Sequence, residues 1–141
     1  MGHKILLTKR LDFAASHRYW NPRWTEEKNK EVFGKCVSPY GHGHNYVLEV
    51  TIEGKVDKDT GMIINVYDLK PLVNDVLKEF DHKNLNEDTR YFKDLIPTTE
   101  NIARVLWGLI DRRLREASAC RLYRIRLYET PDLYVDYRRE E

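Results

Sequence analysis

The chain has 141 residues, with 24 lysines and arginines against 23 aspartates and glutamates, so its formal net charge is only +1. This balance gives no sign of nucleic acid or a membrane as a partner. No apolar run approaches the length that a bilayer requires, and the N-terminus lacks the apolar stretch of a signal peptide. The length of the chain predicts a single domain over residues 1–141. Two cysteines far apart in sequence, Cys36 and Cys120, make no disulfide framework, so we expect both to be reduced and the protein to be located in the cytoplasm.

The first predicted element is a strand over residues 5–17. Its odd-numbered side chains are mostly apolar and end in His17, whereas most even-numbered ones are polar, which is typical of a half-buried strand. Residues 42–52 show the same alternation, and their apolar face begins with His42 and His44. If the two strands pair antiparallel, the end of the first lies beside the start of the second. We therefore expect His17, His42 and His44 to meet at one edge of a sheet.

Three imidazoles on one face can bind Zn²⁺ and leave a fourth position open for water or substrate. Cys36 is separated from His42 by five residues, and a thiol near a metal can act as a base or nucleophile. The neighbouring Lys35 and the metal would both favour its thiolate form. This pattern predicts a zinc enzyme. A zinc-stabilised binding module, with Cys36 as a fourth ligand that closes the site, is the alternative without turnover.

A cupin-like metal site is a further alternative, because the two histidines are followed by Glu49. Glu49 has the opposite parity to the histidines, so in a regular strand it faces away from them. Two long amphipathic helices also do not suit a jelly roll. The sequence therefore argues against a cupin.

The other predicted elements alternate helices with strands. Thr25 is expected to cap a short helix that runs to Val32. A hairpin follows, with strands over residues 44–56 and 62–66 around a turn at residues 57–61. Two helices with apolar stripes come next, one capped by Asp68 and running to Phe80, the other covering residues 98–114. The last elements are strands over residues 121–130 and 133–138. This order predicts an α+β fold in which two helices cover one face of an antiparallel sheet.

Polar residues at element ends are further candidates for chemistry. Asp81 directly precedes His82, and a carboxylate can orient an imidazole, although an ordinary helix end would explain the pair equally well. Glu129 ends the apolar face of a strand and could hold a guanidine-like edge by two hydrogen bonds, or simply be solvated. The second long helix begins with free backbone N–H groups that could bind an anion or carbonyl, at Thr98, Thr99 and Glu100.

Several motifs together resemble one family. They are FAASHR at 13–18, FGKC at 33–36, GHGHNY at 41–46, GM at 61–62, DLK at 68–70, FDHKNL at 80–85, TTEN at 98–101 and YET at 128–130. In this order they resemble the 6-pyruvoyl-tetrahydropterin synthases, a family with the tunnelling fold. The resemblance covers nearly the whole chain. It implies a four-stranded antiparallel sheet with two helices on one face, and sheets joined into the barrel of a trimer or hexamer.

The resemblance also assigns roles to the candidate residues. It implies zinc ligands at His17, His42 and His44, a catalytic thiol at Cys36, and a pterin-binding glutamate at Glu129. It further implies a catalytic pair at Asp81 and His82. The helix start is expected to contact the substrate through Thr98, Thr99 and Glu100.

The reaction implied by the resemblance is that of a zinc-dependent lyase. It converts 7,8-dihydroneopterin triphosphate into 6-pyruvoyl-tetrahydropterin, with loss of triphosphate, in tetrahydrobiopterin biosynthesis. The related 6-carboxy-tetrahydropterin synthases of queuosine biosynthesis are the alternative. They typically have three residues between the cysteine and the first histidine of the pair, whereas this chain has five, as in the pyruvoyl branch.

Overall fold

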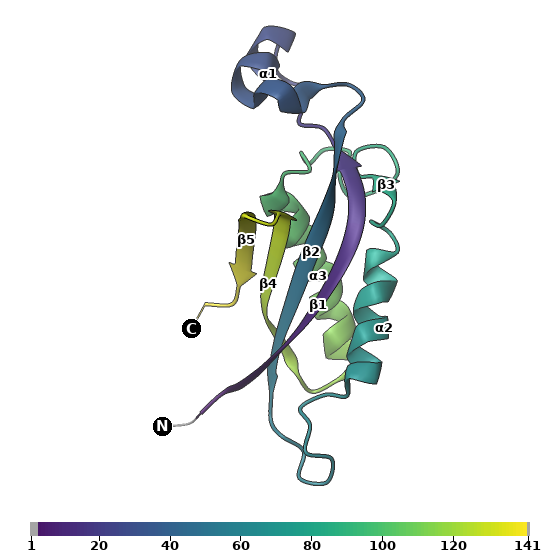
Figure 1. Cartoon of the computed structure of the whole chain (residues 1–141), viewed down its shortest axis with the longest axis vertical. Helices are drawn as coiled ribbons and strands as arrows, with labels where there is room; N and C mark the ends of the chain where they lie inside the picture. The colour runs from purple at the N-terminus through teal and green to yellow at the C-terminus, as the bar shows by residue number, and fades with distance from the viewer. Residues whose placement is uncertain (1–2, 141) are drawn as a thin grey trace.

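The computed structural model describes residues 3–140, which form one sheet and its covering helices (Figure 1). The strands are β1 (Ile5–His17), β2 (His42–Gly54), β3 (Lys83–Asn84), β4 (Arg121–Thr130) and β5 (Leu133–Arg138). The helices are α1 (Glu26–Phe33), α2 (Val66–Leu77) and α3 (Thr99–Ala117), with a 3₁₀ turn, η1 (Gly34–Val37). Among these residues, no helix combines the length and apolar character needed to cross a bilayer.

The sheet has five strands in the order β3-β1-β2-β4-β5. Four of them are antiparallel, as expected, but β3 adds a short parallel pairing to β1 that the expected four-stranded sheet lacks. β3 is only two residues long, so it has no alternation of apolar and polar side chains that could reveal it. The observed sheet therefore has one strand more than the four that the resemblance implied.

β1 and β2 pair antiparallel along their full length, which confirms the expected arrangement. Their register runs from Ile5 opposite Gly54 to His17 opposite His42. The apolar face of both strands lies in the core, where Leu48, for example, is fully buried. Because the register has no shift, side chains that start on the core face of the two strands continue to alternate regularly between the two faces along the whole pair.

α2 and α3 cover the core face of the sheet, in agreement with the predicted layers (Figure 1). Their fully or nearly fully buried residues recur at helical spacing: Leu69, Val73, Val76 and Leu77 in α2, and Ile102, Ala103, Leu106, Ile110 and Leu114 in α3. The two apolar stripes and the apolar sheet face form a single core.

The expected strand at residues 62–66 does not form, and this prediction was wrong. Both edges of β2 are already paired, one with β1 and the other with β4, so no edge is left for a returning hairpin strand. The segment instead leads into α2, which begins earlier than predicted. Asn65, not Asp68, is its N-cap and accepts a hydrogen bond from the backbone N–H of Tyr67 at 2.9 Å.

Residues 18–41, which we call the arm, project from one end of the sheet and contain α1 and η1 (Figure 1). Thr25 caps α1 as predicted, with its side chain accepting from the N–H of Lys28. The arm is held together from within by Asn29, which is fully buried. Asn29 accepts from the N–H of Asn21 at 2.7 Å and donates to the carbonyls of Asn21 and Thr25, each at 3.0 Å.

Candidate active site

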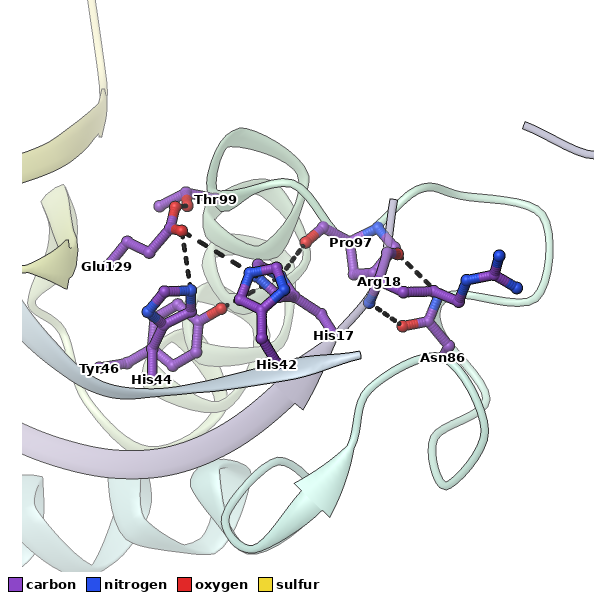
Figure 2. A network of polar contacts seen from close by, with 9 residues as sticks. All are labelled: His17, Arg18, His42, His44, Tyr46, Asn86, Pro97, Thr99 and Glu129. Atoms are coloured by element: carbon purple, nitrogen blue, oxygen red, sulfur yellow. Dashed lines mark hydrogen bonds and ion pairs between the residues drawn. The ribbon is translucent and has the colours of Figure 1, made fainter. Parts of the chain in front are cut away.

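The three predicted metal-binding histidines meet at the end of the sheet from which the arm projects (Figure 2). His17 lies opposite His42 in the β1–β2 register, and His44 is one step further along the same face. One ligand atom from each histidine and a carboxylate oxygen of Glu129 all lie within 4.8 Å of one another. These four residues form what we call the ligand cluster.

Two hydrogen-bond partners orient His17, which is fully buried. Its Nδ1 lies 2.7 Å from the carbonyl oxygen of Pro97 and 3.2 Å from the hydroxyl of Tyr46. A carbonyl can only accept, so Nδ1 carries the proton and the lone pair is on Nε2. Burial lowers the pKa of His17 to about 4, so the ring is neutral at physiological pH. Nε2 faces Nε2 of His42 at 3.1 Å, which is the arrangement of two ligands that share a cation.

Glu129 reaches the ligand cluster from the end of β4. Its Oε1 lies 2.9 Å from Nε2 of His44 and 4.0 Å from Nε2 of His17, while its Oε2 accepts a hydrogen bond from the Thr99 hydroxyl. The sequence predicted Glu129 to bind substrate, but did not place it against the histidines.

The ligand cluster fits a bound metal ion. Nε2 of His44 is buried and makes no well-aligned hydrogen bond, despite its close contact with Glu129. Burial, countered in part by the Glu129 charge, lowers the pKa of His44, which favours the neutral form that binds metals. Imidazole nitrogens with a carboxylate oxygen are a donor set suited to a first-row metal such as zinc.

The polar residues at the start of α3 have two different roles, one in capping the helix and one in contacting the ligand cluster. Thr98 is the N-cap, and its hydroxyl accepts from the N–H of Asn101 at 3.1 Å. Thr99 is buried and donates to Glu129, whereas Glu100 is exposed in the first turn. The structure thus brings Thr99 into contact with the ligand cluster and uses the Thr98 side chain to cap the helix.

Cys36 lies in η1, within range of the Glu129 charge but outside the group of four ligand atoms. Its carbonyl accepts a hydrogen bond from the N–H of Tyr19 at 2.8 Å, which ties η1 to the part of the arm that directly follows β1. Burial, and then the negative charge of Glu129, raise the pKa of the Cys36 thiol. These effects oppose the thiolate that Lys35 was expected to favour, so a cation in the ligand cluster would be needed to offset them.

Asp81 and His82 form the expected pair, with Oδ1 and Nδ1 3.0 Å apart. The backbone N–H of Ala14 donates to the same Asp81 oxygen at 2.9 Å and lowers the pKa of that carboxyl group. His82 adopts a left-handed backbone conformation with φ of 61°, and its N–H bonds to the Ala14 carbonyl. The pair is therefore fixed to the edge of β1.

The structure does not bring this pair to the ligand cluster of its own chain. The His82 side chain is 83% exposed and lines a hollow of about 380 Å³. Ala15 and His44 also border the hollow, but the remaining residues that β1 and β2 contribute to it, Ala14, Ser16, Gly43 and Asn45, belong to the face of the sheet opposite the helices. His17 and His44 have the opposite parity, so they face the other way.

Several residues of the site were missed by the sequence analysis. Tyr46 continues the alternation of His42 and His44, so its parity could have identified it. The contact of the Pro97 carbonyl with His17 could not be predicted from the sequence, because every residue has a backbone carbonyl. Asn86 accepts from the N–H of Arg18 and donates to its carbonyl, which fixes the chain just after His17 (Figure 2).

Known proteins of one family are similar to this chain over nearly its full length. The family model of 6-pyruvoyl tetrahydropterin synthase matches residues 6–140. The 6-pyruvoyl tetrahydrobiopterin synthase of Poecilia reticulata is 46% identical over 135 residues, which cover 95% of this chain and 90% of that protein. The structure of Caenorhabditis elegans 6-pyruvoyl tetrahydropterin synthase has a TM-score of 0.89 at 32% identity, covering 98% of this chain and 97% of that one. The 6-carboxy-5,6,7,8-tetrahydropterin synthase of Aquifex aeolicus is 28% identical over 161 residues, covering 95% and 98%.

Proposed function

Because the chain belongs to the 6-pyruvoyl tetrahydropterin synthase family, we propose that it is a lyase that converts 7,8-dihydroneopterin triphosphate into 6-pyruvoyl-tetrahydropterin and triphosphate. This is a step of tetrahydrobiopterin-type pterin biosynthesis. The observation that carries the proposal is the ligand cluster, in which three imidazoles converge beside a carboxylate and a thiol. Both cysteines are free, which is consistent with a cytoplasmic location.

The metal in this proposal is Zn²⁺, held by His17, His42 and His44. When bound, zinc supplies a Lewis acid that lowers the pKa of hydroxyl groups on the substrate side chain. The protein's own part is to aim the three nitrogens at one point. The hydrogen bond from His17 to the Pro97 carbonyl does this for the buried ligand.

Glu129 and Cys36 act on two parts of the substrate. The Glu129 carboxylate accepts from the amino group and ring N–H of the pterin, a planar edge that suits two parallel hydrogen bonds. Thr99 fixes the carboxylate from behind. Cys36, as thiolate, takes a carbon-bound proton from the side chain, and its position in the arm beside the ligand cluster supports this role.

Asp81 and His82 are proposed to act in the ligand cluster of a neighbouring subunit. They lie on the opposite face of the sheet from their own cluster, in an exposed hollow, so a second copy is needed to bring the proton-transfer pair to the substrate. Two sheet edges are available for association. β5 is one, and at the other β3 covers only Ala15 and Ser16 of β1. We propose a trimer or hexamer in which sheets join into a barrel.

Mass spectrometry of the pterin product tests the reaction. After incubation with 7,8-dihydroneopterin triphosphate and zinc, we expect release of triphosphate and a pterin that keeps its three-carbon side chain as a pyruvoyl group. A 6-carboxy product with acetaldehyde would instead identify the queuosine-type activity. The five residues between Cys36 and His42 favour the pyruvoyl product, because loop length decides which carbon-bound proton the thiol can reach. No triphosphate release would contradict both and favour a non-catalytic zinc-binding module.

A further inference from the structure

A second hollow, of about 520 Å³, lies between the arm and the segment that follows β3. Three cationic side chains line it, Arg18 and Arg23 from the arm and Lys93 from the facing segment. Nζ of Lys93 donates to a backbone carbonyl, that of Glu87, at 3.1 Å. Among residues 3–140, none of the three cations is ion-paired with a carboxylate. We call this cavity the arm hollow.

Arg18 is the cation of the arm hollow whose charge is best preserved. The hollow is also lined by two carboxylates, those of Glu87 and Asp94. Both are exposed, as are Arg23 and Lys93, so water and salt screen these four charges. Arg18 is half-buried, and its charge is therefore screened least. An anion in the hollow would interact most strongly with Arg18.

Two neighbours hold the Arg18 guanidinium in place. Its Nε and Nη2 donate to the Val37 carbonyl at 3.2 and 2.8 Å, and its centre lies 4.5 Å from that of the Trp20 ring. A guanidinium has five N–H groups, so these two bonds leave the others, including both on Nη1, for another acceptor. A planar set of N–H donors that is fixed in advance suits the oxygens of a phosphate.

The arm hollow adjoins the side of the ligand cluster that lies away from Glu129. Arg18 directly follows His17, and Ile96, which lines the hollow, directly precedes Pro97, whose carbonyl contacts His17. Figure 2 shows Glu129 on one side of the histidines and the Arg18 side chain on the other, pointing away from them. A ligand that is held by Glu129 and continues past the histidines is thereby led towards Arg18.

We propose that the arm hollow binds the triphosphate of the substrate, with Arg18 as the principal contact and Arg23 and Lys93 as outer cations. This inference rests on the proposed function, in which Glu129 binds the pterin and the histidines hold the metal that meets the side-chain hydroxyls. The triphosphate is attached at the end of that side chain, so it extends beyond the ligand cluster. It assigns a site to the one part of the substrate that the ligand cluster does not bind.

The test compares two ligands that differ only in their phosphates, neopterin and neopterin triphosphate, by the fluorescence of the pterin. In Arg18→Gln, the Kd for neopterin triphosphate should rise about tenfold to a hundredfold, because a charged hydrogen-bond donor is lost. The Kd for neopterin should not change. Arg23→Gln, at an exposed cation, should raise the Kd for neopterin triphosphate only about twofold to fivefold.

Arg112→Gln is the matched control, because it removes the same charge at an exposed position near the other end of α3. It should change neither Kd. Salt provides a second readout, since it screens the attraction between the cations and the phosphates. Raising the salt concentration should weaken the binding of neopterin triphosphate more in the unmodified protein than in Arg18→Gln.

The inference would be overturned if the unmodified protein bound both ligands equally well, or if Arg18→Gln left the Kd for neopterin triphosphate unchanged. Should Arg18→Gln also weaken neopterin binding, through its bonds to Val37, the double variant Arg23→Gln with Lys93→Gln decides. A loss confined to neopterin triphosphate then supports the inference, and no loss overturns it. An unmodified protein that binds neither ligand would instead contradict the proposed function.

Discussion

At the scale of single residues, the site depends on groups that fix the ligands rather than on the ligands alone. The Pro97 carbonyl selects the tautomer of His17, and Thr99 holds one oxygen of Glu129. Oε1 of the Glu129 carboxylate also lies 2.9 Å from Nε2 of His44. These neighbours therefore decide how the nitrogen and oxygen atoms of the ligand cluster are oriented.

Metal content separates the ligands from the proposed base. A His42→Ala protein should lose most of its zinc by elemental analysis, because one of three imidazole ligands is gone. Cys36→Ala should keep its zinc and lose turnover, since Cys36 lies outside the four clustered ligand atoms. Full zinc occupancy in His42→Ala would contradict the ligand assignment. Loss of zinc from Cys36→Ala would favour a binding module with a closed four-ligand site.

At the scale of elements, the arm is a separate unit whose internal bonds place Cys36. Its helix α1 is short and carries mostly polar residues, so packing against the core contributes little to its position. The three hydrogen bonds of the buried Asn29 side chain replace that packing. Gly41 closes the arm with φ of 71°, where an added Cβ would come within 2.8 Å of the His17 carbonyl oxygen.

Replacing Asn29 with alanine should loosen the arm without touching the ligand cluster. The backbone groups of Asn21 and Thr25 would lose their bonds to this side chain, at a cost of about 1 kcal/mol for each bond. Hydrogen exchange should speed up over residues 21–37, and turnover should fall while zinc content stays constant. Glu31→Ala, at an exposed position of the same helix, is the control and should change neither. Unchanged exchange in Asn29→Ala would show that the arm is held in another way.

At the scale of the whole molecule, the side chains of the ligand cluster and of His82 lie on opposite faces of the sheet of one chain, and in the proposed oligomer each forms half of a site. His82 borders the hollow on the face away from the helices. Exposed apolar side chains also lie on the edge strand β5, at Leu133 and Tyr134, and at Ile5 in the part of β1 that β3 does not cover. Joining copies of the sheet edge to edge would cover these residues and could bring the two half-sites together.

Subunit mixing tests this arrangement. Light scattering should show a trimer or hexamer, and a monomer at micromolar concentration would contradict the architecture. Cys36→Ala and His82→Ala proteins should each be inactive alone. If each site takes its thiol and its imidazole from different copies, random mixing after refolding should restore about a quarter of the unmodified activity. No recovery in mixed oligomers would show that both groups act within one chain.

Local periodicity allowed much of the fold and the meeting of the three histidines to be predicted. The parity of β1 and β2 puts His17, His42 and His44 on one face, and the helical spacing of apolar residues identifies α2 and α3. Each of these features is a pattern of apolar and polar residues within one short segment, so it can be recognised before any long-range contact is known. The resemblance of the motifs to the synthase family added the expectation that Glu129 binds a pterin.

Only the tertiary structure decided the features that depend on which strand edges are still unpaired and on which distant side chains meet. Residues 62–66 cannot be a strand because β1 and β4 occupy both edges of β2, and β3 exists only because β1 has an open edge for it. The position of His82 at the edge of β1 and the contact of Thr99 with Glu129 both join segments far apart in sequence. Periodicity records the environment of each segment separately, so it carries no information about which distant groups meet.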